Sequence, residues 1–395
     1  MRPPSLLQPP PLSMYVHMPW CVVKCPYCDF NSHALTGELP QQAYIDALLQ
    51  DLELELADTW GRTVHSIFIG GGTPSLFEAS AIERLLLGIG ARVNLSPNAE
   101  ITLEANPGTV EHDRFEAYRD AGVNRVSLGI QSLNDTHLKT LGRIHDADQA
   151  QHAIEAVKAA GFERINLDLM WGLPEQTVAM MESDLTAVLA HATGHVSHYQ
   201  LTIEPNTVFA AKPPTLPDED TIIAMGERAA ELFQDLGHTP YEISAWARPG
   251  HEARHNQNYW RFGDYLGIGA GAHGKLTLAQ DNRIIRRRRK LVPHSYLSAA
   301  QDGSFVAEQS DVPESERAFE YFLNRFRLAE PIGYDEFESR TGLSRHTIAP
   351  TLETAASLGL VTLTDHAIVR TSLGARYLND LQQLFLDAST EDSTE

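Results

Sequence analysis

The only cysteines of this 395-residue chain lie in the stretch Tyr15-Val16-His17-Met18-Pro19-Trp20-Cys21-Val22-Val23-Lys24-Cys25-Pro26-Tyr27-Cys28-Asp29-Phe30, with the spacing CxxxCxxC. Three thiolates so spaced on one loop can wrap one face of an iron–sulfur cubane and ligate three of its four irons. The fourth iron then stays open, and an outside ligand with an amine and a carboxylate can chelate it. Cys21, Cys25 and Cys28 therefore predict a [4Fe-4S] cluster with one open iron.

Two other interpretations of the three cysteines stay open at this point. A structural zinc ion would need a fourth protein ligand, and His17 or His33 lies close in the sequence. Zinc ligands, however, usually come as two separated short-spaced pairs. Three inert, buried cysteines are the other alternative, but packing gives no reason for them to share one proline-containing loop. The cluster is favoured over both.

Composition and charge narrow the class of protein. With 43% hydrophobic residues, the chain is long enough for a large core, which excludes a disordered or fibrous protein. The net charge of −21 argues against a general binder of nucleic acid or anionic membranes, because either surface would repel the molecule. No apolar stretch approaches 18 residues, and the proline-rich start makes a poor signal peptide. A cytoplasmic protein is the expectation.

A strand followed by a helix recurs about six times in the first half of the chain, which indicates an α/β fold. Runs such as 165–169 are nearly continuously apolar, as in parallel strands buried on both sides. Residues 44–56 place apolar side chains on one helix face. Periodicity alone does not decide between an open sheet and a barrel. The expected strands are 13–17, 65–69, 100–104, 125–130, 164–170 and 198–203.

The rest of the chain divides by composition. A proline-rich break at 212–217 precedes an expected helix at 218–236 and a strand at 241–245, and 255–274 is expected to be dominated by loops. The order of elements between 315 and 370 resembles a winged-helix module, without the dense basic face that would indicate nucleic-acid binding. The expected divisions are a flexible N-terminal segment (1–12), a (β/α) domain (13–240), a linking segment (241–310), a C-terminal α+β domain (311–380) and an acidic tail (381–395), whose end from 387 we expect to be disordered.

Polar or glycine residues stand where several expected strands end. The carboxyl ends of parallel strands meet at one edge, where α/β proteins build their sites. Gly71, Gly72 and Thr73 leave room for a ligand to approach the backbone, and the absence of a following Gly-Lys-Ser/Thr excludes a phosphate loop. Glu104, Gln131 and Asp168 are polar residues in apolar runs; each alone is as consistent with a structural hydrogen bond as with a ligand contact, and together they favour a ligand site.

The CxxxCxxC loop after the first strand of a βα series resembles the radical S-adenosylmethionine superfamily. Four motifs in order, Cys25 to Phe30, Gly70 to Ser75, Glu104 to Pro107 and Gly129 to Ser132, further resemble the oxygen-independent coproporphyrinogen III oxidase family. The match runs from about residue 13 to 380. The resemblance implies a partial (β/α)6 barrel, a HemN-type C-terminal domain, and a [4Fe-4S] cluster that cleaves S-adenosylmethionine.

The same resemblance implies which residues line the S-adenosylmethionine pocket. A guanidinium at Arg143 can pair with the cofactor carboxylate, although a surface arginine at a helix end is the alternative. Thr202 and His273 are added from spacing alone. The positions that match the family are Tyr15, Tyr27, Cys28, Gly71, Gly72, Thr73, Glu104, Gln131, Arg143 and Asp168.

Three later segments carry weaker signals. The run His255 to Tyr259 resembles an HNxxY motif associated with haem, which makes His255 a candidate haem ligand, although a hydrogen-bonded structural histidine is more common. Gly267 to Gly274 lacks the context of a dinucleotide fingerprint and is expected to let the backbone approach a cofactor. Arg286 to Lys290 is either a solvated hairpin or loop face or a docking patch for haem propionates or an acidic partner.

Two departures from the oxidase pattern favour a different branch. True oxidases carry a fourth cysteine two residues after the third, where this chain has Phe30, and a longer arm before the first strand. The chain resembles instead a haem chaperone branch that binds haem, cluster and S-adenosylmethionine and transfers haem to acceptor proteins. No catalytic residue is assigned, and a transient membrane-protein contact and a homodimer are left open. A working oxidase is the second candidate, and a zinc-containing interaction protein the third.

Overall fold

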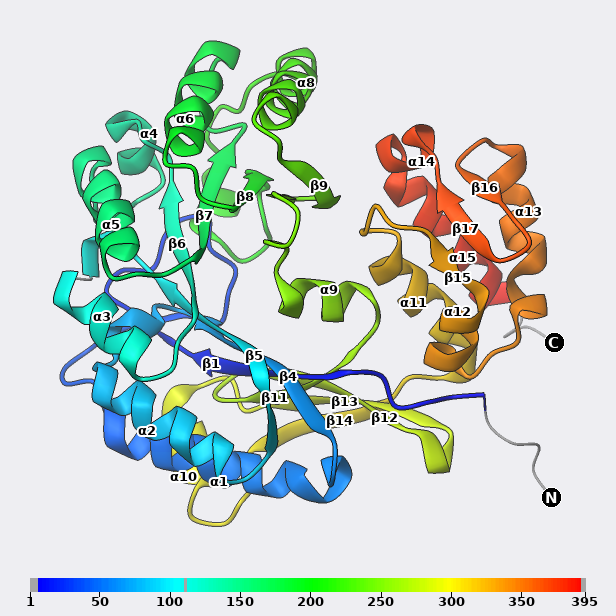
Figure 1. Cartoon of the computed structure of the whole chain (residues 1–395), viewed down its shortest axis with the longest axis horizontal. Coiled ribbons are helices and arrows are strands. Elements are labelled where there is room, and N and C mark those ends of the chain that lie inside the picture. Colours follow the sequence, from blue (N-terminus) through cyan, green and yellow to red (C-terminus); the bar gives the residue numbers. More distant parts are fainter. Residues whose placement is uncertain (1–5, 110–111, 392–395) are drawn as a thin grey trace.

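Six parallel strands build the first half of the chain, in a computed structural model that describes residues 6–109 and 112–391 (Figure 1). They neighbour one another in chain order, and each adjacent pair is parallel. The predicted strands form, with two differences in bounds: the third begins at Asn94, six residues before the prediction, and the last runs from His195 to Gln200, three residues early at each end. The strands are β1 (Leu12–Met18), β4 (Thr63–Gly71), β5 (Asn94–Ala105), β6 (Arg125–Gln131), β7 (Arg164–Trp171) and β8 (His195–Gln200).

Helices cover the outer face of these strands (Figure 1). The expected helix at 44–56 forms as part of α1, and its Tyr44, Ile45, Leu48 and Leu52 are fully buried against the sheet because they share one face. In the part of the chain that the structure describes, the two edge strands of the sheet do not pair, so the barrel is partial. The helices are α1 (Gln41–Thr59), α2 (Ala79–Gly90), α3 (His112–Asp120), α4 (Asp135–Thr140), α5 (Ala147–Ala159), α6 (Val178–Ala190), α7 (Val208–Ala211) and α8 (Glu219–Asp235).

The segment 241–310 extends the sheet, and the expectation that loops dominate 255–274 is wrong, because this stretch contains most of α9, β11 and the start of β12. β11 (Asp264–Ile268) pairs in parallel with β1, and β12 (His273–Leu278), β13 (Arg283–Arg289) and β14 (Val306–Asp311) follow antiparallel. Gly267 is required where β11 meets β12, since a Cβ there would lie 1.9 Å from the carbonyl oxygen of His273. Helices α9 (Arg254–Trp260) and α10 (Pro293–Ala299) complete the segment. The expected strand at 241–245 is instead a hairpin of β9 (Thr239–Glu242) and β10 (Ala245–Ala247) at the other sheet edge.

The basic run Arg286 to Lys290 is not a solvated loop face, and its alternative as a docking patch stays a prediction. It lies mostly within β13, and its arginines pair with carboxylates on other elements. Arg289 is 1% exposed and bonds to Asp51 and Glu55 of α1. A guanidinium can be buried when acidic partners satisfy it, so these charges fasten the added strands to the barrel.

The C-terminal module has the predicted winged-helix-like order and its own apolar core (Figure 1). The predicted acidic tail is wrong in part, because α15 (Leu378–Glu391) continues through it and buries Leu381 and Phe385. Residues 392–395 of that tail lie outside the described residues. The remaining elements are α11 (Arg317–Arg325), β15 (Ile332–Gly333), α12 (Tyr334–Thr341), α13 (Ala349–Ser357), β16 (Val361–Leu363), β17 (Ala367–Arg370) and α14 (Ser372–Arg376).

The N-terminal segment 6–11 joins the C-terminal module to the barrel. Leu7 is 3% exposed and belongs to the apolar core of the module, while the amide of Gln8 donates to the carbonyl of Ser339 at 2.8 Å. Pro10 and Pro11 then lead into β1. The expectation of a flexible segment at 1–12 is therefore corrected for 6–12, and residues 1–5 lie outside the described part. None of the helices within that part is long and apolar enough to cross a membrane.

Candidate functional site

The cysteine loop is held over the ends of β1 and β4. Short parallel strands β2 (Trp20–Cys21) and β3 (His33–Ala34) close the base of the loop, and the amide of Cys28 donates to the carbonyl of Cys25 at 3.2 Å. The amides of Gly72 and Thr73 donate back to Met18 and Trp20, both at 2.7 Å. The loop is therefore tied to the turn that follows the second barrel strand.

The three thiols suit a cluster. All are unpaired and partly exposed, and they line one cavity of about 570 Å³. Burial raises the pKa of Cys21 and of Cys28, which favours the protonated thiols in the protein alone. Cationic iron would stabilise the thiolate form, which is the form that ligates a cluster. Across the described residues, no group of three or more His, Cys, Asp or Glu side chains is arranged to hold a single metal ion. A cubane offers a separate iron to each thiolate, so the sulfurs need not meet at one point.

His17 is a poor fourth ligand for zinc in this arrangement. Its Nδ1 lies 2.8 Å from the hydroxyl of Tyr15, and its Nε2 lies 2.8 Å from the carbonyl oxygen of Asn31. Both ring nitrogens are thus engaged, and a metal bond would break one of these contacts.

The glycines after β4 are required by the packing of the loop. Gly71 has a φ of +115°, and a Cβ there would lie 2.5 Å from the His17 ring. A Cβ on Gly72 would lie 2.5 Å from the carbonyl oxygen of Trp20. Larger residues would push the cysteine loop away from the strand ends. The two glycines thus allow the cysteine loop to lie close to the ends of β1 and β4, and they also leave the backbone open to the cavity.

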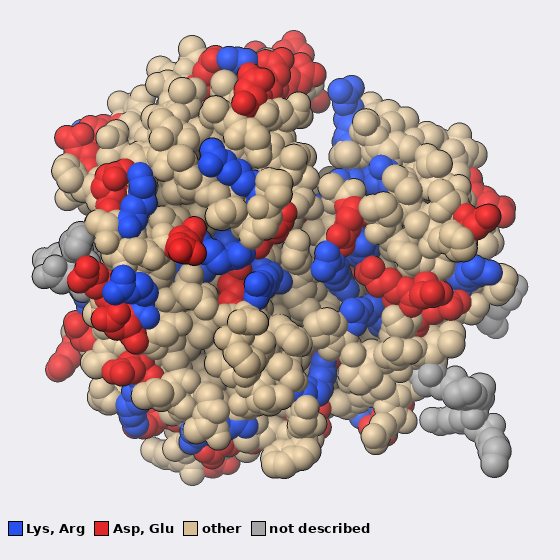
Figure 2. Space-filling view, viewed as in Figure 1, with Lys and Arg blue, Asp and Glu red and all other residues tan. Residues whose placement is uncertain are grey.

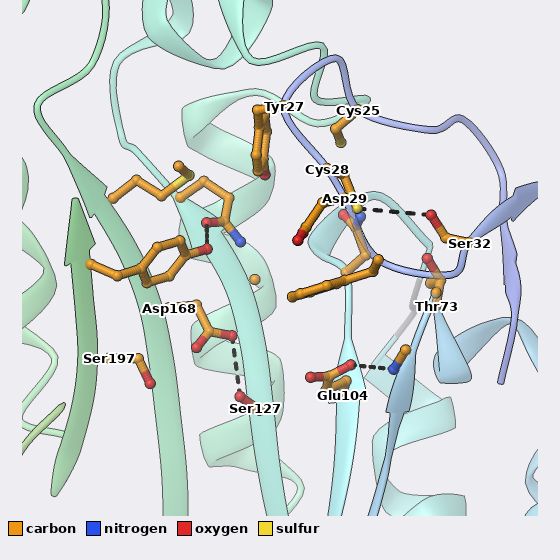
Figure 3. A pocket seen from close by; sticks show the side chains of 18 of the residues that line it. Cys25, Tyr27, Cys28, Asp29, Ser32, Thr73, Glu104, Ser127, Asp168 and Ser197 are labelled. Carbon is orange, nitrogen blue, oxygen red and sulfur yellow. Dashed lines mark hydrogen bonds between the residues drawn. The ribbon is translucent and has the colours of Figure 1, made fainter. Parts of the chain in front are cut away.

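Two carboxyl groups face the cysteine loop across the cavity (Figure 3). Glu104 accepts a hydrogen bond from the amide of Gly71 at 2.9 Å, and burial, with the nearby Asp168, raises its pKa to about 8. Asp168 accepts hydrogen bonds from the hydroxyl of Ser127 at 3.1 Å and from the side-chain amide Nδ2 of Asn166 at 2.7 Å. Burial also raises the pKa of Asp168. These groups can hold protons or accept bonds from a polar ligand at the strand ends.

Arg143 points into the cavity, so the alternative of a surface arginine is wrong. One guanidinium nitrogen donates to the carbonyl of Gly129 at 2.9 Å, and another lies 3.6 Å from the sulfur of Cys25. The buried Nε has no partner in the described parts of the chain. A buried, unsatisfied cationic donor beside the cluster loop fits an anionic group such as the cofactor carboxylate.

The structure brings most of the predicted site residues together around this cavity. Gln131 has a positive φ of +69° and accepts a hydrogen bond from the hydroxyl of Tyr199, while Thr202 lies exposed at the rim and donates to Glu204 at 2.7 Å. Tyr15 and His273 lie elsewhere. The predicted residues that line it are Cys21, Cys25, Tyr27, Cys28, Gly71, Gly72, Thr73, Glu104, Gln131, Arg143, Asp168 and Thr202.

Several lining residues were missed. Ser127 on β6, and Ser197 and Tyr199 on β8, line the same cavity. Alternate residues of a strand point to one face, so the positions two and four residues before Gln131 face inward with it. Extending the strand backwards from Gln131 in steps of two would have found Ser127. The same steps from Thr202 fall on Gln200 and His198, so they miss Ser197 and Tyr199, whose place beside Asp168 and Met170 only the sheet register shows.

A second cavity, of about 640 Å³, adjoins the first and holds Tyr15 and His273. The two cavities share Asp29, Phe30, Gly71, Glu104 and Trp260 in their walls. The second cavity is rich in aromatic side chains and reaches α11 of the C-terminal module through Asn324.

His255 lines neither cavity. It is 7% exposed, its Nδ1 lies 3.2 Å from a carboxylate oxygen of Glu100, and its ring lies 4.2 Å from that of Phe68. Burial lowers the pKa of His255. The residue anchors α9, whose end places Tyr259 and Trp260 at the second cavity.

Sequence comparisons agree with the site. Residues 15–188 match the family model "Radical SAM superfamily", and residues 312–377 match "HemN C-terminal domain". Heme chaperone HemW of Escherichia coli is 48% identical over 95% of this chain and 98% of its own, and heme chaperone HemW of Haemophilus influenzae is also 48% identical over the same shares. The chain belongs to the HemW family of the radical SAM superfamily. Membership implies a [4Fe-4S] cluster and S-adenosylmethionine, and the first cavity fits both.

A solved structure shares the fold of this HemW family member. The coproporphyrinogen III oxidase HemN from Escherichia coli, a radical SAM enzyme, superposes with a TM-score of 0.80 over 95% of this chain and 90% of its own. Its sequence is 22% identical, so the likeness shows the partial barrel and the C-terminal module but not the activity.

Proposed function

We propose that this HemW family member binds haem beside a [4Fe-4S] cluster and S-adenosylmethionine and passes the haem to acceptor proteins. One observation carries the proposal: the cavity that holds the cysteines shares a wall with a second cavity, in which seven of the nineteen lining residues are Tyr, Phe or Trp. Pockets of this size, largely apolar with a few polar groups, are typical of sites for bulky planar cofactors. The names of the relatives, heme chaperone, agree with a haem occupant.

The residues of the first cavity would hold the two smaller groups. Cys21, Cys25 and Cys28 would bind the cluster, which when bound supplies an electron to its neighbour. Arg143 would pair with the carboxylate of S-adenosylmethionine through its unsatisfied Nε. Glu104 would accept hydrogen bonds at the strand ends while keeping its bond to Gly71.

Phe30 argues against the second candidate, oxidative decarboxylation of coproporphyrinogen III. It stands where the oxidase pattern has its fourth cysteine, is 60% exposed, and lines both cavities. An apolar ring there supplies surface for a porphyrin but no redox or ligand chemistry. A homodimer, a transient membrane-protein contact and a cytoplasmic location belong to the proposal as predictions.

The test is haem loading followed by transfer. Protein purified and reconstituted without oxygen is titrated with haemin, with and without S-adenosylmethionine, and then mixed with apomyoglobin as a generic acceptor. We expect stoichiometric haem binding and transfer to the acceptor. Carbon dioxide released from coproporphyrinogen III, without stable haem binding, would establish the oxidase instead. A protein that neither binds haem nor releases carbon dioxide would contradict both.

A further inference from the structure

The second cavity has two unlike surfaces. Aromatic rings form the larger one, and the rings of Tyr15 and Phe68 lie nearly parallel within it, 6.1 Å apart. The rings of Tyr259 and Tyr265 meet edge to face at 4.8 Å. The aromatic side chains of the cavity are Tyr15, Phe30, Phe68, Tyr259, Trp260, Phe262 and Tyr265. Such a surface suits the faces of a large planar ring system.

The other surface is one face of the added strands β11, β12 and β13. His273 is paired directly with Arg288, and Lys275 with both Arg286 and Tyr265. Directly paired residues of antiparallel strands point to the same face. The imidazole of His273 in this cavity therefore lies on the same face as the cationic side chains of Lys275, Arg286 and Arg288. Figure 2 shows Lys and Arg side chains gathered along the boundary between the barrel and the C-terminal module.

The cations of this face are already partnered. Lys275 bonds to Asp264 at 3.1 Å, Arg286 to Glu320 of α11, and Arg288 to Glu308 at 2.8 Å. Lys275 is fully enclosed, whereas the side chains of Arg286 and Arg288 are 36% and 35% exposed. The two arginines can thus offer remaining donors to a carboxylate that reaches them from the cavity.

His273 is the available imidazole of this cavity. His17, the other histidine in its wall, uses both ring nitrogens on Tyr15 and Asn31. His273 is exposed, and within residues 6–109 and 112–391 its ring has no hydrogen bond or ion pair. Neutral imidazole is a common axial ligand of haem iron. His255, by contrast, is buried behind Phe68 and bonded to Glu100.

We propose that haem binds in the second cavity with its iron on His273, its ring against the aromatic wall, and its propionates toward Arg286 and Arg288. The proposal rests on the proposed function and names the site for it. His255 then acts as a positioning residue, since its bond to Glu100 holds α9 and so places Tyr259 and Trp260 against the porphyrin. In the HNxxY motif, Tyr259 thus lines the haem site, and His255 holds α9 in place from behind that wall.

The experiment compares alanine variants of three histidines in the full chain, with the cluster reconstituted. Haemin is titrated into the wild type, His273→Ala, His255→Ala and, as a matched control, His346→Ala on the exposed surface of the C-terminal module. Resonance Raman spectra excited in the Soret band report the axial ligand, and each measurement is repeated with free imidazole. Iron and sulfide analysis confirms that the cluster is intact.

We expect His273→Ala to weaken haem binding roughly 10-fold and to lose the imidazole signature, with both restored by free imidazole. His346→Ala should match the wild type. His255→Ala should weaken binding through a displaced α9, and imidazole should not restore it. Unchanged affinity and axial ligation in His273→Ala would overturn the proposal, as would rescue of His255→Ala by imidazole. A wild type that binds no haem would instead overturn the proposed function.

Discussion

Glu104 shows how a single side chain at the site is tuned by its surroundings. Its carboxyl lies among the strand ends, and burial together with Asp168 raises its pKa from 4.5 to about 8. A group whose pKa is raised on folding favours the folded state while it is protonated. That contribution is complete below pH 4.5 and is lost as the pH rises through about 8.

Glu104→Gln tests this reasoning in the cluster-free protein. Glutamine keeps an acceptor for the Gly71 amide but cannot ionise. We expect the variant to become progressively more stable than the wild type between pH 4.5 and 8, by at most about 1.4 kcal/mol per pH unit, with a constant difference above. Denaturant unfolding at a series of pH values measures it. A difference that does not vary with pH would show that the carboxyl is not perturbed.

Cys25→Ala tests the cluster ligands. Because each thiolate binds its own iron, we expect anaerobically reconstituted Cys25→Ala to retain little iron and sulfide while the wild type holds a full cluster. Ser32→Ala is the control, since Ser32 lies 3.8 Å from the sulfur of Cys28 but is not a ligand. Full iron and sulfide content in Cys25→Ala would remove this residue from the ligand set.

At the scale of elements, β13 shows what sequence patterns can miss. The barrel strands could be predicted because their continuous apolar runs indicate burial on both faces. Much of the site could be predicted as well, because its residues stand where these strands end. The run Arg286 to Lys290 reads as surface, because its partners Asp51 and Glu55 lie more than 200 residues away in the sequence. A charged strand is buried only through such distant pairs, which no local pattern encodes.

Arg289→Met tests how much the buried ion pairs of Arg289 with Asp51 and Glu55 contribute to the stability of the protein. Burial raises the pKa of Asp51 to about 6 even with Arg289 beside it, so removing the cation leaves a carboxylate that is costly to ionise. We expect Arg289→Met to lower the free energy of unfolding by about 3 kcal/mol at pH 8. Arg283→Met, which removes an exposed partner of Asp311, should have no resolvable effect. Equal stability of the two variants would show that the buried pair adds nothing.

At the scale of the whole molecule, both cavities and the two modules depend on long-range assembly. The residues of the first cavity could be predicted from the strand ends and the family resemblance. The second cavity could not, because it forms only where β11 to β13, α9 and α11 come together. His273 was predicted from spacing alone, and the structure places it in that second cavity with Tyr15 rather than among the other predicted residues.

Leu7→Ala tests how the N-terminal segment 6–11 contributes to this assembly. Leu7 is buried in the core of the C-terminal module, and loss of its side chain leaves a cavity there. We expect the variant to lose about 2 kcal/mol of stability and to show faster amide hydrogen exchange in α11 and α15. Leu6→Ala is the matched control, because Leu6 is 44% exposed. Unchanged exchange in the module would mean that Leu7 does not support it.

The placement of Leu7 also has a consequence for biosynthesis. A ribosome releases Leu7 long before Phe385, although both belong to one apolar core. The nascent barrel can form its early strands in order, but this leading end lacks its partners in the C-terminal module, such as Ser339 of α12, until that module emerges. Completion of the molecule therefore requires a late docking step, in which segment 6–11 packs on the C-terminal module after that module has been synthesised.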